Sequence, residues 1–230
     1  MRRLVAEEAA ELFMSEPVDG FSHFDLASLS QADSYKLLAS VILPRPIAWV
    51  VTRAADGNEA GALNAAPFSF FNIISSDPPL VAISFARASD RDGKDTLSYI
   101  RARNEFVVNL VSEELADAMN VTATNAPRGV DETQLAGLET APSAIVDVPR
   151  IAASPVALEC RLFQIIEPGG SSVIVLGRIV YVHVLTEAFT DLAKLYIDPS
   201  KLRLIGRMHG AGGYATTREV FTIDRKSWPL

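Results

Sequence analysis

The sequence predicts a mainly β protein, an antiparallel barrel with peripheral helices. Five or six short segments are rich in β-branched, aromatic and other apolar residues, as strands are. The connections between them are mostly of hairpin length or contain one predicted helix, which is typical of antiparallel barrels. The expected strands are 47–52, 59–64, 80–85, 105–111, 157–166 and 173–184.

The chain divides into an arm and one domain. Residues 1–33 are expected to form a peripheral arm or helix, and residues 34–230 a single domain. A short helix is expected to begin with Asp33 or Ser34 as its cap. The Pro44-Arg45-Pro46 segment prevents that helix from continuing, because each proline lacks an N–H and disfavours helix before it. A strand must therefore start after Pro46.

Turn and cap signals connect the middle elements. Asp56-Gly57 predicts a hairpin between the first two strands. Asp95 or Thr96 can cap a helix over Thr96–Arg103, and a second helix is expected over Glu113–Asn120. Residues 121–155 show no strong periodicity and are rich in Pro, Gly and Asp, so we expect a long surface excursion there.

The last two strands carry local irregularities. The alternation that places Leu158, Cys160 and Leu162 on one face then slips, so that Phe163 and Ile165 are expected to continue it, which predicts a β-bulge near Leu162. Cys160 should therefore be a structural residue that faces the core. Gly177 interrupts a long apolar strand and marks either a bulge or a close approach by a neighbour or a ligand.

Composition excludes several classes of protein. The 230 residues are 49% hydrophobic and 21% charged, the profile of a globular protein with a sizeable core. A net charge of −7 argues against a nucleic-acid interface, which needs clustered Lys and Arg. One cysteine excludes an internal disulfide and a thiolate zinc site, and three histidines leave little for a metal cluster.

No membrane segment is expected. No run reaches 18 consecutive apolar residues. Glu7, Glu8 and Glu11 interrupt the apolar run that a secretory signal requires. A reducing, cytoplasmic setting fits these features.

The stretch Asn64–Leu80 is the first candidate for a binding site. It is too aromatic for a solvent loop and too rich in Asn, Ser and Pro for an ordinary core strand. Apolar planes with interleaved amide and hydroxyl groups suit a wall for a flat, hydrogen-bonding ligand. The alternative is a buried strand that enters a turn stopped by proline.

Lys94-Asp95-Thr96 is the second candidate. A lysine and a threonine at a helix start bring together an ammonium, a hydroxyl and free backbone N–H groups, which is what a phosphate needs. The alternative is a plain helix cap beside a solvated lysine.

The glycine-rich segment Gly210–Ala215 formally satisfies a dinucleotide-binding pattern. Only 15 residues follow Ala215, too few for the remaining helix, strand and acidic partner of that unit, so a turn is the better interpretation. The sequence also lacks the simplest hydrolase, metallopeptidase and P-loop motifs.

Several of these segments, taken in their order and spacing, resemble the flavin reductase-like, FMN-binding split-barrel family. They are Pro44–Thr52, Asn64–Asn72, Ser75–Pro79, Asp92–Thr96 and Glu105–Leu110, followed by 137–138, 151–160 and 177–180. The likeness covers roughly residues 34 to 215. The segment Asp131–Leu135 departs from the family, in which an acidic-aromatic pair is more usual.

The resemblance implies an antiparallel, Greek-key-like split barrel and a homodimer with FMN near the subunit interface. It implies a flavin reductase-type oxidoreductase that passes hydride from NADH or NADPH to the flavin, with a monooxygenase or another electron acceptor as partner. The alternative is a flavoredoxin-like electron carrier or an FMN-binding protein without nicotinamide-dependent turnover.

The resemblance also implies site residues. The flavin ring and ribityl chain would lie against Trp49, Asn64, Pro67, Phe70 and Phe71, and the phosphate near Ser69, Lys94 and Thr96. Arg45 would be a second phosphate cation, or a surface charge between two prolines. His183 would lie over the flavin face, or be a structural histidine. Tyr214, in a glycine-rich segment that could close over the flavin, offers a flat ring beside the nicotinamide, or belongs to a loose C-terminal turn.

Overall fold

The computed structural model describes residues 20–55, 62–86, 95–127, 129–210 and 212–228. The chain divides into two compact units, Met1–Leu43 with His209–Gly212, and Pro44–Met208 with Gly213–Leu230. The predictions for residues 2–15, the Asp56-Gly57 turn and Lys94 lie outside the described residues.

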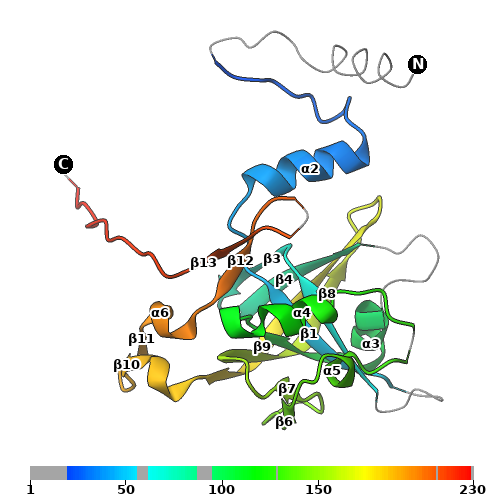
Figure 1. The fold of residues 1–230 in the computed structure, drawn as a ribbon, viewed down its shortest axis with the longest axis vertical. Helices are drawn as coiled ribbons and strands as arrows, with labels where there is room; N and C mark the ends of the chain where they lie inside the picture. Colours follow the sequence, from blue (N-terminus) through cyan, green and yellow to red (C-terminus); the bar gives the residue numbers. More distant parts are fainter. Residues whose placement is uncertain (1–19, 56–61, 87–94, 128, 211, 229–230) are drawn as a thin grey trace. The chain divides into compact units, whose positions relative to one another are not determined.

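The larger unit is built on one antiparallel sheet of seven strands, in the order β2-β1-β5-β8-β9-β4-β3. Figure 1 labels β1, β3, β4, β8 and β9 of this sheet. The prediction of a mainly β, antiparallel fold is therefore confirmed. The strands are β1 (Ala48–Arg53), β2 (Leu63–Phe68), β3 (Phe71–Ser76), β4 (Pro79–Ala86), β5 (Glu105–Asn109), β8 (Val156–Ile166) and β9 (Ser172–Val184).

Strand β2 lies within the stretch that was singled out as a wall. It overlaps the predicted strand 59–64, of which residues 59–61 lie outside the described residues, and it extends to Phe68, pairing with β1 through Trp49 opposite Pro67. Strand β2 is the outermost strand at one edge of the sheet, so its outer edge pairs with no other strand of the sheet. Edge strands tolerate proline, which explains why Pro67 does not exclude this segment from the sheet.

Short elements complete the larger unit. The helices are α3 (Asp95–Arg103), α4 (Ala116–Val121), α5 (Glu132–Leu135) and α6 (Pro199–Leu202), with 3-10 turns η2 (Glu113–Leu115) and η3 (Thr186–Ala188). Three small pairs of strands are β6 (Thr140–Ala141) with β7 (Arg150–Ile151), β10 (Phe189–Asp191) with β11 (Tyr196–Ile197), and β12 (Ile205–Arg207) with β13 (Tyr214–Thr216). The predicted helix 113–120 is thus a 3-10 turn followed by a short α-helix, and the dinucleotide-like glycines lie in the turn between β12 and β13.

The smaller unit contains helix α2 (Gln31–Val41). Its cap is Ser30, whose hydroxyl accepts a hydrogen bond from the N–H of Asp33, so the predicted caps Asp33 and Ser34 are wrong by three and four residues. Asp33 instead accepts bonds from the Ser30 hydroxyl at 2.6 Å and from Lys36 at 2.9 Å. An acidic residue in the first turn is favoured by the helix dipole, which explains its position inside the helix.

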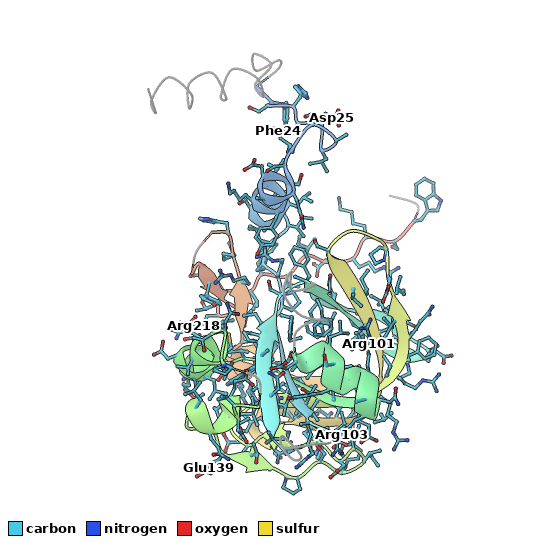
Figure 2. All side chains as sticks on the ribbon, turned by 90° about the vertical axis from the view of Figure 1, so that its right-hand side faces the viewer. Phe24, Asp25, Arg101, Arg103, Glu139 and Arg218 are labelled. Carbon is cyan, nitrogen blue, oxygen red and sulfur yellow. The ribbon has the colours of Figure 1, made fainter. Side chains whose placement is uncertain are left out.

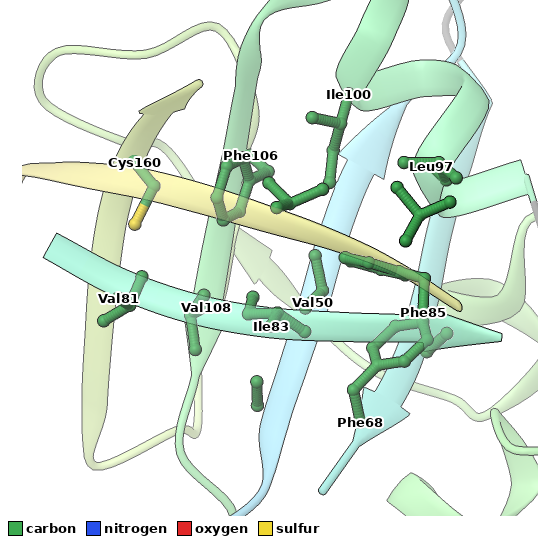
Figure 3. Packing of buried hydrophobic residues seen from close by; sticks show 14 residues of the cluster. Val50, Phe68, Val81, Ile83, Phe85, Leu97, Ile100, Phe106, Val108 and Cys160 are labelled. Atoms are coloured by element: carbon green, nitrogen blue, oxygen red, sulfur yellow. The ribbon is translucent and has the colours of Figure 1, made fainter. Parts of the chain in front are cut away.

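The main core confirms two predictions about the long strands (Figure 3). Cys160 is fully buried in the cluster of apolar side chains that also contains Phe106 and Val108. Burial, and the charge of Glu159, raise the pKa of its thiol far above the ordinary value. A Cβ at Gly177 would lie 2.4 Å from the Cζ atom of Phe106, so this glycine permits the close approach that the sequence indicated.

The predicted bulge near Leu162 is also present. Leu162 pairs with Gly177 and Gln164 pairs with Leu176, which leaves Phe163 without a partner on β9. The extra residue turns the Phe163 ring outward, where it is 45% exposed and lies 5.2 Å from the guanidinium carbon of Arg178. The expectation that Phe163 continues the inward face is therefore wrong, whereas Ile165 packs against the core as expected.

Candidate functional site

Several of the predicted site residues fall into two groups at the two ends of β2, together with residues that were not predicted. Asn64 lies near the start of the strand and Phe68 at its end, about 13 Å apart at the usual rise of a strand. We call Asn64, Thr52, Thr96 and Glu132 the amide–carboxyl cluster. We call Arg45, Ser69, Phe70, Arg207 and Tyr214 the arginine corner.

The amide–carboxyl cluster is a buried hydrogen-bond network centred on Asn64. Its Oδ1 atom accepts bonds from the hydroxyls of Thr96 at 2.5 Å and Thr52 at 3.4 Å. Its Nδ2 atom donates to Oε2 of Glu132 at 2.8 Å. The four side chains are each at most 7% exposed. Thr96 therefore orients Asn64 in this arrangement, and its hydroxyl is not turned toward solvent.

Glu132 is an acid inside this network. Burial raises its pKa to about 7, and the charge of Asp95 adds to the increase, while the bonds from the Ala65 N–H and the Asn64 amide oppose it. A carboxyl with a pKa near neutrality changes its charge within the working range of most proteins. The cluster can therefore take up or release a proton close to neutral pH.

The arginine corner joins the end of β2 to the hairpin β12–β13. Arg45 is 6% exposed; its Nε lies 3.4 Å from Oγ of Ser69, and its Nη2 donates to the carbonyl of Met208 at 2.9 Å. Its guanidinium carbon lies 6.0 Å from the centre of the Phe70 ring, at the limit of a cation–π contact. Arg45 is therefore a buried, bonded cation rather than a surface charge between prolines.

Arg207 brings a second cation to the same corner. Arg45 and Arg207 exchange two backbone hydrogen bonds, of 3.0 and 2.8 Å. In such an antiparallel pair the two side chains lie on the same face. The guanidinium carbon of Arg207 lies 4.8 Å from the ring centre of Tyr214, which is 38% exposed.

A largely apolar cavity of about 210 Å³ lies beside this corner. It is lined by Pro44, Arg45, Pro46, Ile47, Leu110, Val111, Leu204, Ile205, Gly206, Ala215, Thr216 and Thr217. A Cβ at Gly206 would lie 3.0 Å from the Cβ atom of Pro44, so a glycine here keeps the hairpin close to the cavity wall.

The aromatic wall is only partly open. Phe70 is 45% exposed, Pro67 is half-buried, and Phe71 packs against the main core. Trp49 is fully buried, and its indole N–H donates to the hydroxyl of Thr122 at 2.9 Å. Trp49 therefore supports the wall from the core, opposite Pro67, and does not present its ring at the surface.

His183 lies apart from both groups. It shares a row of the sheet with Pro67, but strands β1, β5 and β8 lie between them. Its Nε2 atom lies 2.6 Å from Oε1 of Glu159, which is fully buried. On these contacts we assign His183 to a cluster around Glu159. The centre of the Tyr181 ring lies 5.0 Å from the centre of the His183 ring.

Sequence reasoning missed Glu132, Thr52 and Arg207. Glu132 is 68 residues from Asn64, in a region without periodicity. Its one sequence signal is the cap Asp131, whose side chain accepts bonds from the N–H groups of Thr133 and Gln134 and so predicts a short helical turn. Arg207 was detectable only as a charge at the end of a strand-like segment.

Metal clusters and membrane-spanning helices were sought among the described residues. Among the described residues, no group of three or more His, Cys, Asp or Glu side chains could hold a metal ion. No helix in the described part of the chain is long and apolar enough to cross a membrane.

Comparisons with known proteins place this geometry in a family. A family model described as "Flavin reductase like domain" matches residues 40–203. An uncharacterized protein of Deinococcus radiodurans is 42% identical over 207 residues, which cover 90% of this chain and 91% of the relative.

Two solved structures are similar over nearly their whole length. The 2-nitrobenzoate 2-nitroreductase of Pseudomonas fluorescens matches with a TM-score of 0.80 at 32% identity, over 90% of this chain and 97% of that one. Component B of nitrilotriacetate monooxygenase from Bacillus cereus matches with a TM-score of 0.81 at 32% identity, over 91% and 100% of the two chains. The resemblance detected in the sequence is confirmed, and the chain belongs to the flavin reductase-like family.

Proposed function

We propose that this protein binds FMN and is a flavin reductase-type oxidoreductase that accepts hydride from NADH or NADPH. The arginine corner carries the proposal, because it joins two guanidinium groups and a hydroxyl to an aromatic and proline wall in a chain of this family. The two solved relatives at 32% identity are named as a nitroreductase and as a monooxygenase component, which supports a role in passing electrons to a second molecule.

The residues present fit a flavin mononucleotide. A flat ring needs an apolar surface with a few polar groups, which Pro67 and the exposed ring of Phe70 provide. A phosphate needs cations or N–H donors, which the start of α3 would offer, while the guanidinium groups of the arginine corner would face the flavin ring beside Phe70. A bound flavin supplies the ring atom that accepts hydride, so the chain itself needs no catalytic triad.

The described side chains then have distinct roles. Phe70 and Pro67 exclude water from one face of the ring, and Trp49 supports them from the core. Arg45, held by Ser69 and Met208, offsets negative charge. Asn64 is oriented by Thr96 and Glu132, and one bond to Glu132 leaves its second amide hydrogen for the ligand.

Two further residues complete the proposal. Tyr214, beside Arg207, covers the open ring face where the nicotinamide would stack. Lys94, which lies outside the described residues, remains a proposed phosphate cation because it precedes α3, at whose start the phosphate would lie.

Flavin binding followed by nucleotide titration tests this function. FMN should bind at least about tenfold more tightly than riboflavin, because a charge-assisted phosphate contact contributes about 1.5–3 kcal/mol. Anaerobic NADH or NADPH should then bleach the oxidised-flavin absorbance in stopped flow, with Tyr214→Ala slower than the matched Tyr214→Phe. Rapid bleaching by dithionite, but by neither nucleotide, would contradict the reductase and favour an electron carrier.

We also propose that the protein is a homodimer, since large apolar side chains are exposed in the single chain. On α2 and its end, Tyr35, Val41 and Ile42 are 58 to 65% exposed, and on strand β3, Ile73 and Ile74 are 60% and 52% exposed. Exposed apolar groups of this kind mark protein interfaces. Light scattering on the flavin-loaded protein should return twice the chain mass of 24.9 kDa; a monomer mass would contradict the proposal.

A further inference from the structure

The outer edge of β2 is closed by one carboxyl group. Strand β2 ends the sheet, so its outward backbone groups have no neighbouring strand. The N–H of Ala65 donates to Oε2 of Glu132 at 3.0 Å, and Pro67, two residues on, has no N–H to offer. Glu132 thus occupies the place that a further strand would take, which is one way in which proteins protect sheet edges.

The same oxygen fixes the amide of Asn64. Oε2 of Glu132 accepts from Nδ2 of Asn64 at 2.8 Å, while two threonine hydroxyls donate to Oδ1 on the other side. A reversed amide would set its oxygen against the Glu132 oxygen and lose these bonds. Glu132 therefore decides where the remaining amide hydrogen of Asn64 points.

We propose that Glu132 is a positioning residue of the flavin site, and that its ionisation weakens FMN binding as the pH rises through neutrality. This inference rests on the proposed function. Hydride transfer itself does not require this buried acid. FMN binding should be accompanied by proton uptake.

The groups that face Glu132 explain why its pKa is raised. From α3 it meets the negative charge of Asp95, from β2 the Ala65 N–H and the Asn64 amide, and on its own element Asp131 precedes it. No lysine or arginine is among the described groups that shift its pKa. Burial already holds the pKa near 7, so part of the population is protonated at neutral pH.

A phosphate anion brought to the start of α3 would add a second negative charge close to this carboxyl. Like charges disfavour ionisation, so FMN should bind best when Glu132 is protonated. By linkage, binding then takes up protons, and affinity falls by at most about tenfold for each pH unit above the carboxyl's pKa.

Calorimetry on the intact wild-type protein measures this directly. FMN is titrated at pH 7.5 in two buffers with different ionisation enthalpies, since at that pH the flavin phosphate is almost fully ionised. We expect net proton uptake, and a dissociation constant that rises about three- to tenfold between pH 6.5 and 8.5. Glu132→Gln, which keeps an oxygen for both donors, should abolish the uptake and flatten the pH profile.

Glu139→Gln is the matched control, because it removes the same charge from an exposed side chain at the surface (Figure 2) and should leave both the uptake and the profile unchanged. FMN binding without proton uptake in the wild type would overturn the inference, whether or not the Gln variant folds. Uptake that persists in Glu132→Gln would overturn it as well. Failure of the folded wild type to bind FMN would instead contradict the proposed function.

Discussion

The pKa values of two buried glutamates of this protein are shifted in opposite directions. Glu132 receives one backbone N–H and one side-chain amide, and burial raises its pKa to about 7. Glu159 is fully buried as well, and burial again opposes its ionisation. It nevertheless accepts bonds from the N–H groups of Ala144, Ile145 and Val146 at 2.6, 2.7 and 3.0 Å, and from His183. Together these four partners hold its pKa below the ordinary value.

The comparison shows that the hydrogen-bond partners and neighbouring charges, as well as depth, decide the charge of a buried acid. Around Glu132, the bonds from Ala65, Asn64 and its own N–H do not offset the loss of water and the charge of Asp95, whereas four donors offset the loss of water around Glu159. Glu159 is therefore an anchor for an irregular segment, and its partners favour the charged form. Glu132 retains an ionisation that a ligand can shift.

The largest effect should come from removing the anchor. Glu159→Ala leaves three N–H groups, of which that of Val146 is buried and those of Ala144 and Ile145 are partly buried, without their acceptor, and we expect a loss of about 3 kcal/mol in the free energy of unfolding. Glu105 holds the next residue of the same segment through one N–H, of Asp147 at 3.0 Å, and its side chain is 23% exposed. Urea denaturation should show a loss of about 1 kcal/mol for Glu105→Ala. Equal losses in the two variants would contradict the donor count.

Glu132 should produce a smaller effect that depends on pH. Its pKa is raised in the folded protein, so the folded state binds more protons than the unfolded one between about pH 4.5 and 7, and stability falls as the pH rises through that range. Glu132→Gln should remove this loss and be more stable than wild type above pH 7, by at most about 3 kcal/mol. Urea midpoints at pH 5 and 8 test the sign: a variant less stable than wild type at pH 8 would contradict it.

Patterns within one strand allowed parts of this fold to be predicted from the sequence. The break in the alternation of apolar residues predicted the bulge at which Phe163 has no partner on β9. The position of Cys160 in the same alternation predicted that its thiol lies in the core. The interruption at Gly177 signalled the approach of Phe106. Each signal lies within a few residues of the structure that it predicts, because strand geometry has a period of two.

The candidate site was less accessible, because its contacts join distant segments. Asn64 was chosen from its neighbours in sequence, but its partner Glu132 lies in a stretch without periodicity. Trp49 was assigned to the wall as an aromatic residue. Its indole N–H, however, donates to the hydroxyl of Thr122, 73 residues away, and the ring is buried. A single sequence reports residue type and local phase, and neither specifies such a long-range hydrogen bond.

Among these substitutions, that of His183 should have the smallest effect on stability. It is the one side chain among the four partners of Glu159, and its own side chain is 25% exposed. With three N–H bonds remaining, we expect His183→Ala to cost only about 1 kcal/mol of stability, since solvent weakens its contact with the carboxylate. Because three strands separate it from the proposed wall, the rate of flavin reduction by NADH or NADPH should not change. A folded His183→Ala protein that binds FMN but reduces it many times more slowly would return this histidine to the flavin site and show that Glu159 positions a catalytic group.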